Sequence, residues 1–213
     1  MSLLSPNACG ALTVGHPGTP HAESSCSDAT SPMAVGDEVR WRPASTSHEY
    51  PPVPFPSRRV FSVAGEPILR ALVKRHHQRL MNTSVANLFP SNPVRFAAGV
   101  EKTADFIVEA TGGPPLFTSA HGHTCMRSRH FRFTIDEQAR EIWLAQLLLA
   151  FDDVGFPQDV REEYWDWVES LSIRVINRRT MRADPRRYPL AEAPLALSHF
   201  MAMLRPLSVV SVD

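Results

Sequence analysis

Hydrophobic positions recur with the period of an α-helix in several segments between residues 60 and 177. The first series has offsets of 3, 4, 7 and 11 residues and comprises Leu69, Leu72, Val73, His76 and Leu80. The second has offsets of 4, 7, 11 and 14 residues and comprises Phe96, Val100, Thr103, Ile107 and Ala110. Residues at such offsets share one face of a helix, so both series predict amphipathic helices.

Turn and cap residues separate these helices from two more. We expect the second helix to end at Gly112-Gly113-Pro114-Pro115, because glycine provides a left-handed cap and proline cannot continue a helix. Asp136 can cap a third helix that runs to about Ala150, and Phe156-Pro157 breaks the chain again. The fourth series comprises Val160, Tyr164, Trp167, Leu171 and Val175. No stretch of four or more residues alternates like a strand, so we predict an all-α fold with four principal helices.

The two ends of the chain lack such periodicity. Nine of the 19 prolines precede Val60, among many Ser, Thr, Gly and His residues. A segment of this kind buries too little apolar area to offset its ordering entropy. We therefore predict a mostly disordered Pro/Ser-rich tail and linker (1–59), a helical domain (60–179) and a C-terminal extension (180–213). Around the start of that extension lie Arg178, Arg179, Arg182, Arg186 and Arg187, which we interpret as a solvated face.

Composition and charge narrow the class of protein. The 22 basic and 22 acidic side chains cancel, and no nucleic-acid reader motif is present, so we do not expect a nucleic-acid partner. No apolar run reaches the roughly 18 residues that a membrane helix needs. The chain start lacks the pattern of a signal peptide. Cys9, Cys26 and Cys125 are too few and too far apart for a disulfide framework, so we expect a cytoplasmic protein.

Most of the candidate chemistry lies in the 17 residues from Phe117 to Phe133. Long loops in compact domains are often functional, and we expect this one to be. Its potential metal ligands are His121, His123, Cys125 and His130. They could bind zinc, although their spacing matches no common zinc motif. Alternatively, one histidine is the axial ligand of a haem iron.

The haem alternative agrees with a family resemblance. The motif consists of Gly112-Gly113-Pro114, Gly122-His123, Met126 to His130, Phe133, Ile135, Arg140 and Trp143. In this order and spacing it resembles the second group of truncated haemoglobins, over about Val60 to Asn177. The resemblance implies a truncated globin, a 2-over-2 helical sandwich with irregular terminal extensions, whose cofactor is haem b (iron protoporphyrin IX).

The resemblance also implies which residues bind the cofactor. His130 matches the proximal histidine, the permanent axial ligand of the iron. Phe89 matches an aromatic residue at the porphyrin edge, and Phe117 matches one on the haem face. Lys102 fits the place of a cation that pairs with a haem propionate, and Arg129 is the second basic residue assigned to haem binding. Alternative interpretations are a helix-end packing residue for Phe89 and a solvated side chain for Lys102.

On the opposite, distal side the resemblance implies Gly99, Thr103 and Trp143. The indole N–H of Trp143 would point toward a bound ligand, whereas Thr103 could instead bond to its own helix backbone. The family usually has Phe-Tyr where this chain has His76-His77. We expect His77 to face the iron and His76 to pack inward. A distal imidazole could bond the ligand or bind the iron directly as a second axial ligand.

These inferences predict a haem protein that binds O2, NO or CO and performs redox chemistry such as removal of nitric oxide or peroxide. Nitric oxide dioxygenase and peroxidase-like activities both stay open, and an unknown reductase would supply electrons. The alternative is a haem-based gas or redox sensor or adaptor that acts through its terminal extensions. A globin that has lost its cofactor is a third interpretation, against which the intact His130 argues. A homodimer is compatible with the sequence.

Overall fold

The computed structural model describes residues 50–202, so most of the predicted N-terminal tail lies outside the described residues. The principal helices are α1 (Arg58–Leu80), α2 (Pro93–Ala110), α5 (Glu137–Asp153) and α6 (Gln158–Val175). The short helices are η1 (Ser84–Leu88), α3 (Leu116–His121), α4 (Met126–His130), α7 (Ala193–Ala196) and α8 (Ser198–Met201). No strand occurs within residues 50–202, so the all-α prediction is confirmed.

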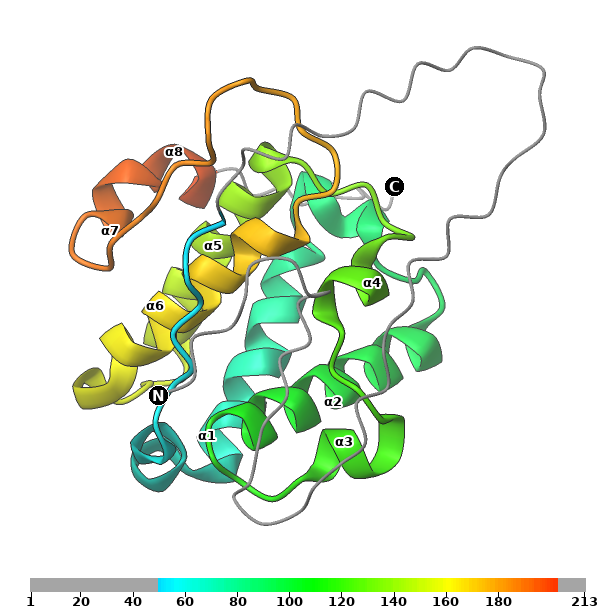
Figure 1. The fold of residues 1–213 in the computed structure, drawn as a ribbon, viewed down its shortest axis with the longest axis vertical. Coiled ribbons are helices and arrows are strands. Elements are labelled where there is room, and N and C mark those ends of the chain that lie inside the picture. Colours follow the sequence, from blue (N-terminus) through cyan, green and yellow to red (C-terminus); the bar gives the residue numbers. More distant parts are fainter. Residues whose placement is uncertain (1–49, 203–213) are drawn as a thin grey trace, which may run out of the picture.

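Two helix pairs form the body of the molecule. α1 packs on α2, α5 packs on α6, and α1 also contacts both helices of the second pair (Figure 1). The apolar faces predicted from the sequence meet between them, where Leu72, Leu144 and Trp167 are completely buried. Burial of each such side chain contributes about 1.5–3 kcal/mol, so this core is the main source of stability. The arrangement is the expected 2-over-2 sandwich.

Local signals set the helix ends. The side chain of Asn92 accepts hydrogen bonds from the first turn of α2, and Asp136 accepts one from the N–H of Ala139 at 2.8 Å at the start of α5. After α2 the backbone turns at Gly112, whose φ is 104°. A Cβ atom there would lie 2.7 Å from the Arg58 side chain, so only glycine fits. These ends lie where the sequence predicts them.

The segment from 117 to 133 is not a plain loop, so this part of the prediction was wrong. α3 covers its beginning and ends at Gly122, where φ is 69°, and α4 follows after four residues. Helices of five or six residues are too short to show a periodic pattern, which needs a window of about 11–18 residues. His121 is the last residue of α3, and His130 is the last residue of α4.

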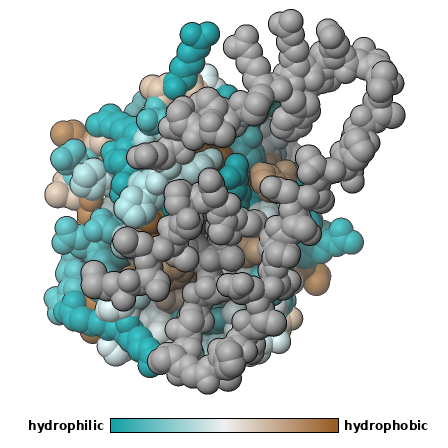
Figure 2. Space-filling model, in the orientation of Figure 1, coloured by the Kyte–Doolittle hydropathy of each residue, from teal (hydrophilic) through white to brown (hydrophobic). Residues whose placement is uncertain are grey.

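The residues flanking the four principal helices pack against them. Phe55 lies beside Trp167, with ring centroids 6.3 Å apart, and Arg174 donates to the carbonyl of Pro51 at 3.3 Å. At the other end, α7 and α8 lie together beside α5 (Figure 1). The described surface on the face shown in Figure 2 is mostly hydrophilic, with scattered hydrophobic residues. None of the described helices is both long and apolar enough to cross a membrane.

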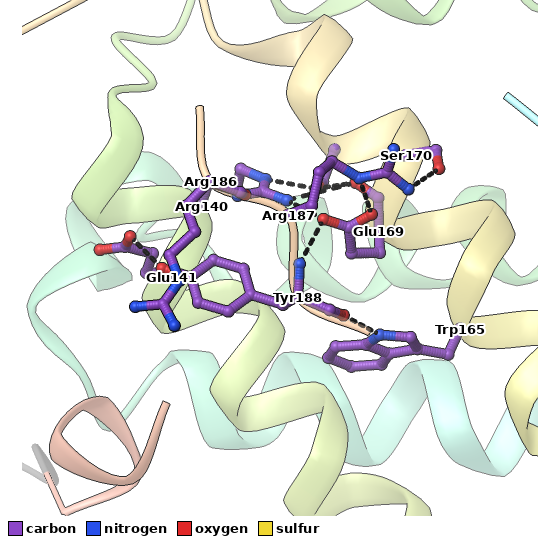
Figure 3. A network of polar contacts seen from close by, with 9 residues as sticks. Arg140, Glu141, Trp165, Glu169, Ser170, Arg186, Arg187 and Tyr188 are labelled. Atoms are coloured by element: carbon purple, nitrogen blue, oxygen red, sulfur yellow. Dashed lines mark hydrogen bonds and ion pairs between the residues drawn. The ribbon is translucent and has the colours of Figure 1, made fainter. Parts of the chain in front are cut away.

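The interpretation of the C-terminal arginines as a solvated face was wrong for Arg179, which is half-buried, and incomplete for Arg187, which is exposed but also pairs with a buried carboxylate. Arg179 pairs with the buried Glu137 at 2.8 Å, and Arg187 pairs with the buried Glu169 at 2.7 Å. Glu169 also pairs with Arg140 at 2.5 Å, at the centre of the network in Figure 3. Buried carboxylates need such partners, because an unpaired charge in the interior is strongly unfavourable.

Candidate functional site

α4 presents His130 with its two ring nitrogens in different roles. Nδ1 lies 2.6 Å from the carbonyl oxygen of Met126. A carbonyl can only accept, so Nδ1 carries the proton and Nε2 of the neutral ring keeps its lone pair. A backbone carbonyl on one nitrogen commonly orients a histidine whose other nitrogen binds a metal. His130 is half-buried, and the neutral ring oriented in this way has Nε2 available to an iron.

Asn177, directly after α6, holds the chain on the far side of His130. Its Nδ2 donates to the carbonyls of His130 at 3.0 Å and Phe133 at 2.6 Å, and its Oδ1 accepts from the N–H of Ile135 at 2.9 Å. In the sequence, Asn177 marks only the end of the family resemblance and is not predicted to have a role in the site. The hydrogen-bond partners of Asn177 lie 42 to 47 residues away in sequence. Its place just after an amphipathic helix was therefore the only local feature that could have suggested its role.

Basic side chains gather around the buried ring of Phe117. The ammonium of Lys102 lies 5.7 Å from the ring centroid and the guanidinium of Arg129 lies 5.1 Å from it. Burial lowers the pKa of Lys102, and the charges of Arg129 and Arg132 lower it further. Within residues 50–202 no ion pair joins any of these three cations to a carboxylate. The described residues thus supply no carboxylate partner to this cluster of cations.

Arg129 has a structural role as well. Its Nη2 donates to the carbonyls of His121 at 3.0 Å and His123 at 2.7 Å, which ties α4 to the segment that follows α3. Its buried Nε has no hydrogen-bond partner. This orphaned donor beside an aromatic ring is consistent with a site built to receive an anion. The guanidinium would then serve both the loop and the anion.

The two histidines of α1 lie as expected relative to the core. His76 is 3% exposed, and its Nε2–H donates to the Trp143 carbonyl at 2.9 Å. Burial, followed by the charge of His77, lowers the pKa of His76 to about 3. His77 is less buried, and its Nδ1–H donates to the Val73 carbonyl at 2.8 Å. Its Nε2 therefore keeps a lone pair, as in His130.

Aromatic rings surround the His77 imidazole. Its centroid lies 5.7 Å from that of Phe89 and 6.3 Å from that of Phe96, both in edge contacts. Burial lowers the pKa of His77, so its ring stays neutral at a lower pH than an exposed histidine would. Phe89 thus contacts His77, one of the predicted distal residues. It also packs beside the small core cluster of Leu80, Val85 and Ile142.

The remaining distal residues lie on α2 and α5. Trp143 is half-buried, its ring lies 4.7 Å from that of His76, and no hydrogen bond within residues 50–202 uses its indole N–H. Thr103 donates to the carbonyl of Gly99 at 3.0 Å, so its hydroxyl follows the backbone-bonded alternative. A Cβ atom on Gly99 would meet nothing within 4 Å, so α2 borders open space here.

These features fit haem better than zinc. In the described part of the chain, no three His, Cys, Asp or Glu side chains converge on a point where a metal ion could bind, and the predicted zinc alternative is not assembled. Imidazole lone pairs on His130 and His77, aromatic rings and cations without carboxylate partners in the described residues match a planar apolar ring with a metal centre and anionic propionates.

A sequence comparison gives the same result. The sequence model of the bacterial-like globin family matches residues 61–177. Group 2 truncated hemoglobin YjbI of Bacillus subtilis is 30% identical over 119 residues, which are 55% of this chain and 88% of that protein.

Solved structures extend the likeness to the fold. Hell's gate globin IV, in a phosphate-bound crystal structure, has a TM-score of 0.67 and 48% identity, covering 72% of this chain and 94% of that one. The truncated oxygen-avid haemoglobin of Bacillus subtilis has a TM-score of 0.52 and 29% identity, covering 55% and 98%. The first match covers more of this chain than the family model does, so the likeness reaches into the flanking segments.

Proposed function

The chain belongs to the bacterial-like globin family, as a truncated 2-on-2 haemoglobin of group II, and from this premise we propose that it performs redox chemistry on nitric oxide or peroxide. Haem b is the cofactor of these globins, and they bind small gas molecules such as O2. When bound, haem supplies gas binding and electron-transfer chemistry that no amino-acid side chain provides. The redox function and the roles of individual residues are our proposal.

On the proximal side, we assign His130 as the axial ligand through Nε2. The Met126 carbonyl accepts from Nδ1–H at 2.6 Å, so the free lone pair of the neutral ring is on Nε2. Lys102 and Arg129 would pair with the propionates, which supplies the anion that their cluster lacks. Phe117, buried between them, would contact the ring.

The observation that carries the redox proposal is the hydrogen bond from His77 Nδ1–H to the Val73 carbonyl. It leaves a lone pair on Nε2, so neutral His77 accepts a proton and does not donate one at that atom. A proton acceptor is what peroxide needs on the distal side, because peroxide loses a proton before its O–O bond is cleaved. The unpaired indole N–H of Trp143 is the complementary donor. An electron donor, such as a reductase, would complete the cycle.

The test compares visible spectra and peroxide reactivity of the purified haem protein and its variants. We expect His130→Ala to lose the haem absorption band, and His77→Ala to keep it but react with peroxide at least about 100-fold more slowly, the usual contribution of a general base. His123→Ala is the matched control, because His123 is exposed and its contact with Arg129 is through its backbone carbonyl. Equal peroxide rates in His77→Ala and wild type would refute the redox role of His77.

A sensor function is the second candidate, because the flanking segments contact both sides of the site. The guanidinium of Arg127, on α4, lies 5.5 Å from the Tyr50 ring centroid, and Phe200 packs against the same small core cluster as Trp143. A sensor requires that ligand binding and segment contacts affect each other equally. Hydrogen exchange of residues 50–57 and 193–202 in ferrous protein with and without CO measures this. Identical exchange in both states would exclude the sensor.

A further inference from the structure

α4, the helix that carries His130, is poorly stabilised by its own sequence. It has five residues, and neither end has a side-chain cap from its flanking residues. Helices this short are marginal in water, because few hydrogen bonds offset the cost of nucleation. The last carbonyl groups of a helix also lack partners within it. The His130 carbonyl accepts from the N–H of Phe133 at 3.0 Å, but that donor belongs to the turn after α4, so the position of the turn depends on contacts with the rest of the chain.

The side-chain amide of Asn177 fills this need. One Nδ2 hydrogen is available for the His130 carbonyl at 3.0 Å and the other for the Phe133 carbonyl at 2.6 Å. Oδ1 accepts from the N–H of Ile135 at 2.9 Å, so both donors and the acceptor are used. In addition, the backbone N–H groups of Asn177 and Arg178 both donate to the Ile135 carbonyl at 3.0 Å. This contact joins the end of α6 to the turn after α4.

We propose that Asn177 is a positioning residue for the axial histidine. The His130 ring is bonded to the Met126 carbonyl within α4, so the ring and the short helix move as one body. Asn177 binds the other end of the same body and connects it to α6, which is anchored in the core. The amide thereby sets the direction of Nε2. This inference rests on the assignment of His130 as the axial ligand.

The experiment uses the full-length haem protein with three substitutions. Asn177→Ala removes all three hydrogen bonds, whereas Asn177→Asp keeps an acceptor for Ile135 and removes only the donors. Arg178→Ala is the matched control, because Arg178 is adjacent and exposed and its contact with Ile135 is through the backbone. The readouts are the iron–histidine stretching band of the ferrous protein by resonance Raman spectroscopy and the rate of haem transfer from ferric protein to an apoglobin acceptor.

We expect both Asn177 variants to shift or broaden the stretching band and to lose haem about tenfold faster, the usual effect of removing a group that supports a metal ligand. Arg178→Ala should match wild type in both measurements. Should Asn177→Ala fail to fold, Asn177→Asp decides the matter alone. A band and a haem-transfer rate unchanged in the folded variant would overturn the proposal.

A cavity variant separates positioning from general destabilisation. In His130→Gly supplied with free imidazole, the iron ligand is no longer attached to α4. Adding Asn177→Ala to this background should leave the iron–imidazole band unchanged, because the amide then has no axial residue to orient. A band that shifts equally in both backgrounds would contradict the proposed route. If wild type shows no iron–histidine band that depends on His130, the ligand assignment itself fails, which is a distinct result.

Discussion

The adjacent histidines of α1 differ in which ring nitrogen binds the backbone. His76 uses Nε2 and reaches across to α5 at the Trp143 carbonyl, whereas His77 uses Nδ1 and bonds the Val73 carbonyl one turn earlier on its own helix. His76 therefore connects two helices and is unavailable to a ligand through Nε2. His77 keeps Nε2 available. We infer a packing role for His76 and a chemical role for His77.

The burial of His76 predicts a specific dependence of stability on pH. Its pKa in the folded protein is about 3, below the unfolded value of 6.5. As the pH falls below 6.5 the unfolded chain gains a proton that the folded chain does not, so the unfolding free energy falls. The loss is about 2 kcal/mol between pH 7 and pH 5.

Urea unfolding of wild type and His76→Gln at these two pH values measures this contribution. We expect the difference between pH 7 and pH 5 to be smaller in the variant by about 2 kcal/mol. The variant is also less stable at pH 7, because the imidazole fills core space that the amide does not. A pH dependence identical to that of wild type would show that His76 is not the group responsible.

At the scale of elements, α8 closes one side of the distal group. α8 packs on α5, and Phe200 contacts the cluster of Leu80, Val85 and Ile142 beside Phe89 and Trp143. A four-residue helix has little stability of its own, so its position depends on these contacts. Residues 198–201 are thus part of the wall around the site.

Phe200→Ala should weaken this wall. Because Phe200 is half-buried, we expect a loss of about 1–2 kcal/mol, below the 3–5 kcal/mol typical of a buried phenylalanine. Flash photolysis of the CO complex should show faster CO association, because a ring is removed from the cluster against which Trp143 also packs. Leu195→Ala, on the neighbouring α7, is the control, since Leu195 is 84% exposed. Equal CO association rates in the two variants would show that α8 does not control the access of ligands to the site.

At the scale of the whole molecule, the segment after α6 (residues 177–188) contacts both α5 and α6. Arg179 and Thr180 bind Glu137 at the start of α5, while Tyr188 and Arg187 bind Glu169 on α6. Figure 3 shows Arg186, Arg187 and Tyr188 of this segment beside Arg140 and Glu169. The same segment begins with Asn177, whose side-chain amide contacts the turn after His130. One segment therefore contacts both the buried ion-pair network and the site.

Glu169→Gln tests this connection. The substitution leaves Arg140 buried without its anionic partner, and we expect a loss of about 3–5 kcal/mol in the unfolding free energy. Glu162→Gln is the matched control, because Glu162 is exposed on the same helix, and its effect should stay within about 0.5 kcal/mol. Chemical unfolding of both variants measures the difference. Equal stabilities would mean that the network contributes nothing to the fold.

The sequence by itself determined the four principal helices, their ends and the order of the site residues. Apolar period and capping act over one or two turns, so Leu69 to Leu80, Asp136 and Gly112 could be interpreted without knowing their tertiary partners. The motif placed His130 and Trp143 at their family spacing. The short helices α3 and α4 were missed, because they contain too few residues for a period to show.

Only the tertiary structure decided how these residues are used. The proton position on His76, the partners of Asn177 and the pairing of Arg187 with Glu169 all depend on groups brought together from other parts of the chain. His76 and Trp143, for example, are 67 residues apart. A hydrogen bond requires its two atoms to lie within about 3 Å, and local sequence cannot specify which distant carbonyl or carboxylate will be there.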